Sequence, residues 1–69
     1  GISGKEAVKK FVKLGYVVVR QRGSHLRLKH IMVEERRPLT IPLHRELKIG
    51  LLRSLLKQAS VTIEVFLDL

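Results

Sequence analysis

The chain has 69 residues, no cysteine, and 14 lysines and arginines against 6 acidic residues, which gives a net charge of +8. A chain this short is expected to form one domain, spanning 1–69. Because it has no cysteine, a disulfide framework and a thiolate metal site are excluded, and this composition fits a reducing cytoplasm. No apolar run approaches the roughly 18 residues of a membrane span, the first residues lack the apolar segment of a signal peptide, and we expect a cytoplasmic protein outside the membrane.

The first predicted element is a helix over about 4–14. Ser3 and Glu6 have the spacing of a capping box, in which each side chain accepts a hydrogen bond from the other residue's backbone. Apolar residues then recur at helical spacing, and Gly15 suits the left-handed conformation that often ends a helix. The lysines of this helix are expected on its outer face.

A β-hairpin is predicted next. The β-branched stretch YVVVRQR, 16–22, favours a strand, and Gly23-Ser24 favours a two-residue type II′ turn. A second strand is expected over 25–32. After a polar loop, a short third strand, 39–41, is expected to end at Pro42 because proline cannot donate to a sheet.

The last third of the chain is predicted to be helical. A stripe of leucines favours a helix that begins near Ile49, and Thr62 can cap a short final helix that buries Val65, Phe66 and Leu67. The predicted fold class is α+β, with a three-stranded antiparallel sheet and helices packed on one face, in the order α-β-β-β-α-α.

The predicted turn also sets a register for the hairpin. Arg22 is then opposite His25, Arg20 opposite Arg27, and Val18 opposite Lys29. On the second face Gln21 is opposite Leu26, Val19 opposite Leu28, and Val17 opposite His30. One face is therefore largely apolar and should meet the helices. The other face carries a histidine among four basic residues: His25, Arg20, Arg22, Arg27 and Lys29.

Such a face is costly for a sheet that meets only water. Like charges directly opposite each other destabilise a sheet, by up to about 1 kcal/mol for each pair. A nucleic-acid backbone or an acidic partner protein would remove this repulsion. Because the sequence has one tyrosine, two phenylalanines and no tryptophan, recognition of RNA by its backbone and shape is better supported than recognition by base stacking.

The same face suggests a catalytic chemistry. A metal-dependent nuclease needs clustered carboxylates, whereas the acidic residues here are scattered along the chain and absent from the basic hairpin. RNA cleavage without a metal needs a proton-transfer group that titrates near neutral pH, and cations that stabilise the charge on phosphorus. His25 has this chemistry, and the alternative is that it is only a polar residue flanking the turn.

The other two histidines have less defined roles at this point. His30 falls on the apolar face or at the end of its strand, which favours a structural role. His44 follows Pro42-Leu43 and could cap a helix, pack, or contact a substrate. Three histidines without a regular ligand spacing give little support for zinc, and we expect neither a metal nor a cofactor.

The sequence resembles the HicA-type, or YcfA-like, toxins of bacterial toxin–antitoxin systems over nearly its whole length. The resemblance rests on SGKE, on GY followed by RQRGSH, on PLH, and on LRSLLKQA, in that order. Members of the family often carry glycine where Ser60 stands.

The resemblance implies a fold similar to the double-stranded RNA-binding domain and an endoribonuclease that cleaves mRNA without a metal. It implies that His25, in Gly-Ser-His, is the catalytic histidine, and that a HicB-type antitoxin is the partner. We expect Arg20, Arg22, Ser24, Arg27 and Lys29 to bind RNA. The alternatives are a non-catalytic RNA-binding module of the same fold and a protein-interaction domain for an acidic partner.

Overall fold

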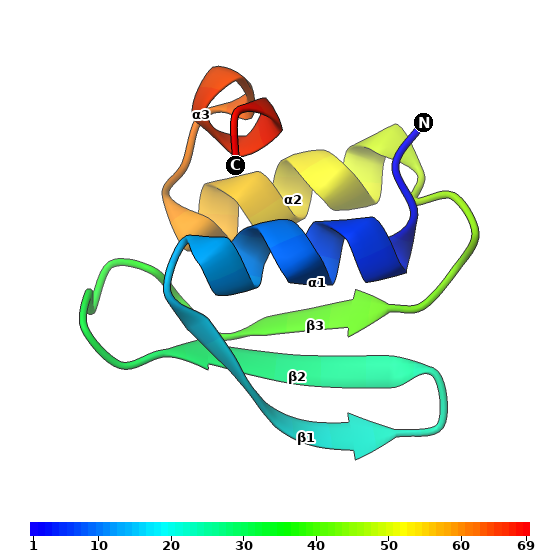
Figure 1. Cartoon of the computed structure of the whole chain (residues 1–69), viewed down its shortest axis with the longest axis horizontal. Helices are drawn as coiled ribbons and strands as arrows, with labels where there is room; N and C mark the ends of the chain where they lie inside the picture. The colour runs from blue at the N-terminus through cyan, green and yellow to red at the C-terminus, as the bar shows by residue number, and fades with distance from the viewer.

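The fold has the predicted order of elements. A computed structural model describes all 69 residues. The chain forms α1 (Gly4–Lys13), β1 (Tyr16–Arg22), β2 (His25–His30), β3 (Leu39–Pro42), α2 (Ile49–Ala59) and α3 (Ile63–Leu67). The strands form one antiparallel sheet in the order β1-β2-β3, and the helices lie together on one side of it (Figure 1). None of the helices has both the length and the apolar character that spanning a bilayer demands.

Both ends of α1 follow the sequence prediction. The Glu6 backbone N–H donates to Ser3 Oγ and the Ser3 N–H donates to Glu6 Oε1, each at 3.0 Å. The hydrogen bond from the Ser3 backbone N–H to the carboxylate, followed by the Ser3 side chain, lowers the pKa of Glu6. Gly15, directly after the helix cap, has a φ of 113°, a region that a residue with a side chain rarely adopts. The capping box and the glycine therefore define the helix as predicted.

The core lies between the sheet and the helices and is centred on Phe11. The Phe11 ring lies 5.7 Å from that of Tyr16, edge to face, and 5.0 Å from that of Phe66. All three residues are buried. The prediction for the last helix was therefore right about its Thr62 cap and about Phe66 but wrong about Val65 and Leu67, which are 49% and 58% exposed. A helix of 5 residues has a single turn to present to the core.

Lys10 also differs from the prediction, because it does not lie free on the outer face of α1. Its Nζ donates to the backbone oxygens of Leu67, at 3.3 Å, and Leu69, at 3.1 Å, and lies 5.8 Å from the centre of the Phe66 ring. A cation beside terminal carbonyls and over an aromatic ring is favourable on both counts. Lys10 therefore helps to hold α3 on α1.

The hairpin register is correct near the turn and wrong beyond it. Arg22 pairs with His25 and Arg20 with Arg27, as predicted, but a β-bulge at Val19 then shifts the pairing by one residue. Val17 consequently pairs with Lys29, where the prediction had Val18. The physical reason is Tyr16, which is 2% exposed: the shift turns this large ring inward, where it buries more apolar surface than a valine would.

The second and third strands also end at other residues than predicted. β2 stops at His30, two residues short of the predicted end at 32. The His30 ring explains this, because its Nδ1 accepts from the N–H groups of Met32, at 3.3 Å, and Val33, at 3.0 Å, which bends the chain away from the sheet. The third strand does not stop before Pro42. Pro42 is the last residue of β3 and is opposite His25. Proline is tolerated here because β3 is an edge strand.

The start of α1 lies directly against the end of β3. Gly4 is buried, and its N–H donates to the His44 carbonyl at 2.9 Å. A Cβ at Gly4 would overlap the Pro42 carbonyl oxygen and lie 2.9 Å from Leu43 Cα. Because these neighbours are backbone atoms, they cannot move aside as a side chain can. The absence of a side chain at Gly4 is therefore a requirement of packing.

The packing at Gly4 can be tested with a pair of glycine variants. We expect Gly4→Ala to lower the free energy of unfolding by about 1–3 kcal/mol through overpacking. Gly50, inside α2, faces open space, and Gly50→Ala should raise it by about 0.5–1 kcal/mol through helix propensity. Urea unfolding of both variants measures the two values. Equal effects would contradict the close approach at Gly4.

Because Tyr16 is buried, we expect the free energy of unfolding to fall at alkaline pH. Its hydroxyl donates to the Arg37 carbonyl at 2.8 Å, and burial raises the pKa of Tyr16, with Arg36 acting weakly in the opposite direction. Because the pKa is raised in the folded state, the stabilisation by Tyr16 is fully present below its unfolded pKa of about 10. This stabilisation is lost as the pH rises through the higher pKa of the folded state.

We therefore expect Tyr16→Phe to be less stable than the parent protein at pH 7, by about 0.5–1.5 kcal/mol for the lost hydrogen bond. The difference should shrink as the pH rises above about 10, because the variant has no phenol to ionise. Urea unfolding of both proteins over this range checks it. A difference that stays constant with pH would show that Tyr16 does not titrate as its burial implies.

Candidate functional site

The outer face of the sheet, away from the helices, holds the basic residues picked out by the sequence. His25 is the first residue of the central strand β2, and its partners in the sheet are Arg22 on β1 and Pro42 on β3. The His25 side chain is exposed, as is that of Arg22. We call this surface the cationic face and define it by six residues: Val17, Arg20, Arg22, His25, Arg27 and Lys29.

A hollow of about 450 Å³ lies in the middle of the cationic face and is lined by Val19, Arg20, Arg27 and Lys29. Its shape depends on the bulge, because the extra residue Val19 borders the hollow beside Arg20. Arg20 and Arg27 are directly opposite each other in the sheet. The structure thus brings together three of the predicted RNA-binding residues in one concave, positively charged site that is open to water.

Arg27 is the one basic side chain of this face that the protein itself positions. Its Nη1 donates to the Thr40 hydroxyl on β3 at 2.8 Å, which fixes the guanidinium across the strands. A guanidinium has five N–H donors, so the remaining ones stay available to a ligand. Thr40 is not among the site residues predicted from the sequence, because its place opposite Arg27 depends on the pairing of β2 with β3.

The hairpin turn presents the Gly-Ser-His segment at one end of the sheet. Gly23 has a φ of 56°, whereas Ser24 has a negative φ, which is the combination of a type II′ turn. The Gln21 side chain donates to the Gly23 carbonyl at 2.9 Å. The Ser24 carbonyl accepts from the Leu43 N–H at 2.7 Å, and its exposed hydroxyl makes no hydrogen bond to the protein. Ser24 and His25 are thus held by backbone contacts while their side chains face solvent.

His30 does not belong to this site. Its Nδ1 accepts two backbone N–H groups, so its Nε2 carries the proton and donates to the Leu14 carbonyl at 3.0 Å. Its ring also packs edge to face on Tyr16, with 5.1 Å between the centres. The structural role expected from the sequence is confirmed. His44, in contrast, is exposed in the segment between β3 and α2.

The chemistry that this arrangement offers is proton transfer beside anion binding. No group of three His, Asp or Glu side chains lies together in a way that could hold a metal ion. The acidic residues lie outside β1, β2 and β3, so no carboxylate from the sheet neutralises the arginines opposite each other. The cationic face therefore combines an exposed imidazole with uncompensated positive charge.

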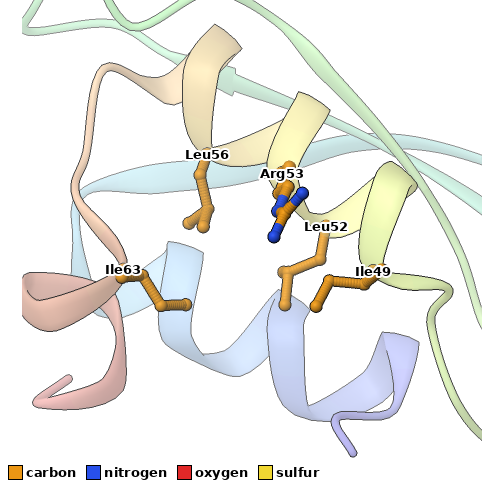
Figure 2. Close-up of a pocket in the computed structure, with 5 residues that line it drawn as sticks. All are labelled: Ile49, Leu52, Arg53, Leu56 and Ile63. Carbon is orange, nitrogen blue, oxygen red and sulfur yellow. The ribbon is translucent and has the colours of Figure 1, made fainter.

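A second, apolar hollow of about 260 Å³ lies between α2 and α3 and is lined by Ile49, Leu52, Arg53, Leu56 and Ile63. Figure 2 shows the side chains of Ile49 and Leu52 on α2 and of Ile63 on α3 directed toward a common space. Arg53 is its single ionisable residue. Because this hollow has no imidazole or carboxylate, it offers no group for acid–base chemistry.

Comparison with known proteins identifies one family. The profile of one family, described as the HicA toxin of bacterial toxin–antitoxin systems, matches residues 4–61. This match includes α1 with the following Gly15, the whole sheet with Gly23-Ser24-His25, and all of α2. No curated protein matches the chain significantly. Since the family profile covers most of the 69 residues, the protein belongs to the HicA toxin family of bacterial toxin–antitoxin systems.

Proposed function

We propose that this toxin is an endoribonuclease that cleaves mRNA without a metal ion, with His25 as a general acid or base. The observation that carries the proposal is the position of His25, an exposed imidazole at the end of the central strand, on a face with four basic residues and no acidic one. A solvated sheet gains nothing from such repulsion, whereas a phosphodiester backbone turns it into attraction.

The proposed reaction is an internal transfer of the phosphoryl group. The 2′-oxygen of the ribose attacks phosphorus while its proton passes to a base, and the bond from phosphorus to the 5′-oxygen breaks as an acid protonates that oxygen. The products are a 2′,3′-cyclic phosphate and a 5′-hydroxyl, and no water is consumed. The arginines and lysine of the hollow would stabilise the negative charge that develops on the phosphate oxygens.

Contacts to the RNA backbone fit this surface better than base stacking. The aromatic rings that could stack, Phe11, Tyr16 and Phe66, are all buried in the core. Arg20, Arg27 and Lys29 line the hollow, and Arg22 and Ser24 extend the contact toward the hairpin turn. Binding would therefore depend on charge and shape, as in the double-stranded RNA-binding domains that this α-β-β-β-α order resembles.

The proposed partner of the toxin is a HicB-type antitoxin in the cytoplasm. Membership of a toxin–antitoxin family implies an antitoxin. An antitoxin with acidic residues directed at Arg20, Arg22 and Arg27 would neutralise the cationic face and exclude RNA from His25 at the same time. Charge complementarity of this kind also accelerates association.

Replacement of His25 tests the catalytic role. We expect His25→Ala to lower the rate of RNA cleavage by about 10²–10⁴-fold, the range for a general acid or base. Binding of RNA should persist, because the basic residues remain. The measurement is cleavage of a synthetic mRNA with and without EDTA, combined with identification of the new RNA ends.

EDTA should leave the rate of the parent protein unchanged, and the new ends should be a cyclic phosphate and a 5′-hydroxyl. Full activity of a folded His25→Ala would remove this histidine from the reaction. If the parent protein binds RNA tightly and never cleaves it, the protein is the non-catalytic RNA-binding module instead. If it binds no RNA even at low salt, an acidic partner protein is the ligand of this face.

The location of RNA binding can be tested through its salt dependence. Arg20→Gln removes a charge from the cationic face, whereas Arg53→Gln removes the same charge from the apolar hollow of α2 and α3. If Arg20 contacts one phosphate, Arg20→Gln should reduce the slope of log affinity against log salt concentration by about 1. Arg53→Gln should leave the slope unchanged. The reverse pattern, measured by fluorescence anisotropy, would move the RNA site to the helices.

A further inference from the structure

Cleavage by the proposed reaction needs two proton transfers, one from the 2′-hydroxyl and one to the 5′-oxygen. The cationic face defined above contains a single imidazole, His25. Its other titratable groups are arginines and a lysine, and arginine does not give up its proton in a protein. The site as described so far therefore lacks one of its two proton-transfer groups.

The segment after β3 brings a second imidazole to the same end of the sheet. Pro42 is opposite His25, and the pairing continues for one more step, because the Leu43 N–H donates to the Ser24 carbonyl at 2.7 Å. His44 follows directly, and the chain bends only at Arg45. Figure 1 shows that the β1–β2 turn and the end of β3 lie at the same side of the sheet.

The pairing also determines on which face His44 lies. Side chains alternate along an extended strand, so Thr40, Pro42 and His44 share a face. Pro42, which is itself buried, and Thr40 are opposite His25 and Arg27, so a chain that stays extended as far as His44 places this residue on the cationic face. His44 is thus the diagonal neighbour of His25, and the Cα atoms of such neighbours are about 7–8 Å apart, which is within reach of long or aromatic side chains.

The backbone of His44 is held in place while its side chain stays free. Its carbonyl accepts from the Gly4 N–H at 2.9 Å, and three residues later the Leu47 N–H donates to the Ile2 carbonyl at 2.7 Å. The His44 side chain is exposed and makes no hydrogen bond to the protein. A fixed backbone with an unengaged imidazole is the arrangement of a group that acts on a ligand rather than on the fold.

We propose that His44 is the second proton-transfer residue of the site and acts on the scissile phosphodiester together with His25. The two oxygens that exchange protons lie on opposite sides of phosphorus. Two imidazoles at diagonal positions, each at hydrogen-bond reach of about 2.6–3.2 Å from its oxygen, can flank a phosphate that lies between them, next to the hollow lined by Arg20, Arg27 and Lys29. This inference rests on the proposed ribonuclease function and assigns that site its missing partner.

The test is the pH dependence of kcat for His44→Gln. This variant keeps a polar side chain but has no titratable group that could act as an acid or a base. We expect a fall in kcat of about 10²–10⁴-fold with KM little changed. The parent protein should show a bell-shaped profile, and His44→Gln should keep a single limb of it. Arg45→Gln, which alters the next residue of the same segment, should keep both limbs.

Thermal unfolding and RNA binding of His44→Gln confirm that the variant is folded. If kcat and both limbs survive in His44→Gln, while His25→Ala abolishes cleavage, this inference is wrong and the proposed function stands. A rise in KM with kcat preserved also overturns it, because His44 would then bind RNA without transferring a proton. If the parent protein does not cleave RNA at all, the proposed function itself fails.

Discussion

The structure depends on the backbone of residues 42–44, where three parts of the chain meet. Pro42 completes the pairing of β3 with His25, the Leu43 N–H reaches the hairpin turn at Ser24, and the His44 carbonyl receives the first N–H of α1 from Gly4. The close approach at Gly4 leaves no room for a side chain. The same contacts that dock the helix on the sheet therefore position the end of the sheet where the imidazoles lie.

The protein divides its positive charges between folding and function. Lys10 holds the end of α3, and Arg36 donates to the carbonyls of Ala59 at 2.8 Å and Ser60 at 3.2 Å, at the end of α2. Such cations are stabilising, because carbonyls at helix ends carry partial negative charge. Arg20 and Lys29 have no comparable partner. The net charge of the chain does not show which cations bind helix ends. Only the remaining cations are available to bind a polyanion.

The bulge at Val19 links the core to the cationic face. Burial of the Tyr16 ring requires a shift of one residue in β1, and the strand takes up this shift by one extra residue that borders the hollow beside Arg20. Bulges commonly redirect side chains next to functional sites. Here the burial of Tyr16 in the apolar core is accompanied by a hollow on the opposite, charged face. The structures of the two faces of the sheet are therefore coupled through the bulge.

The order of the elements, the turn at Gly23 and the pairing of His25 with Arg22 are predictable from the sequence, because caps, turns and short hairpins depend on neighbouring residues. It also identified the basic residues around His25. Local signals do not predict the bulge, the burial of Phe66 without its neighbours, or the diagonal position of His44 relative to His25. These features depend on contacts between segments far apart in the chain, where competition for a small core, rather than local preference, selects the arrangement.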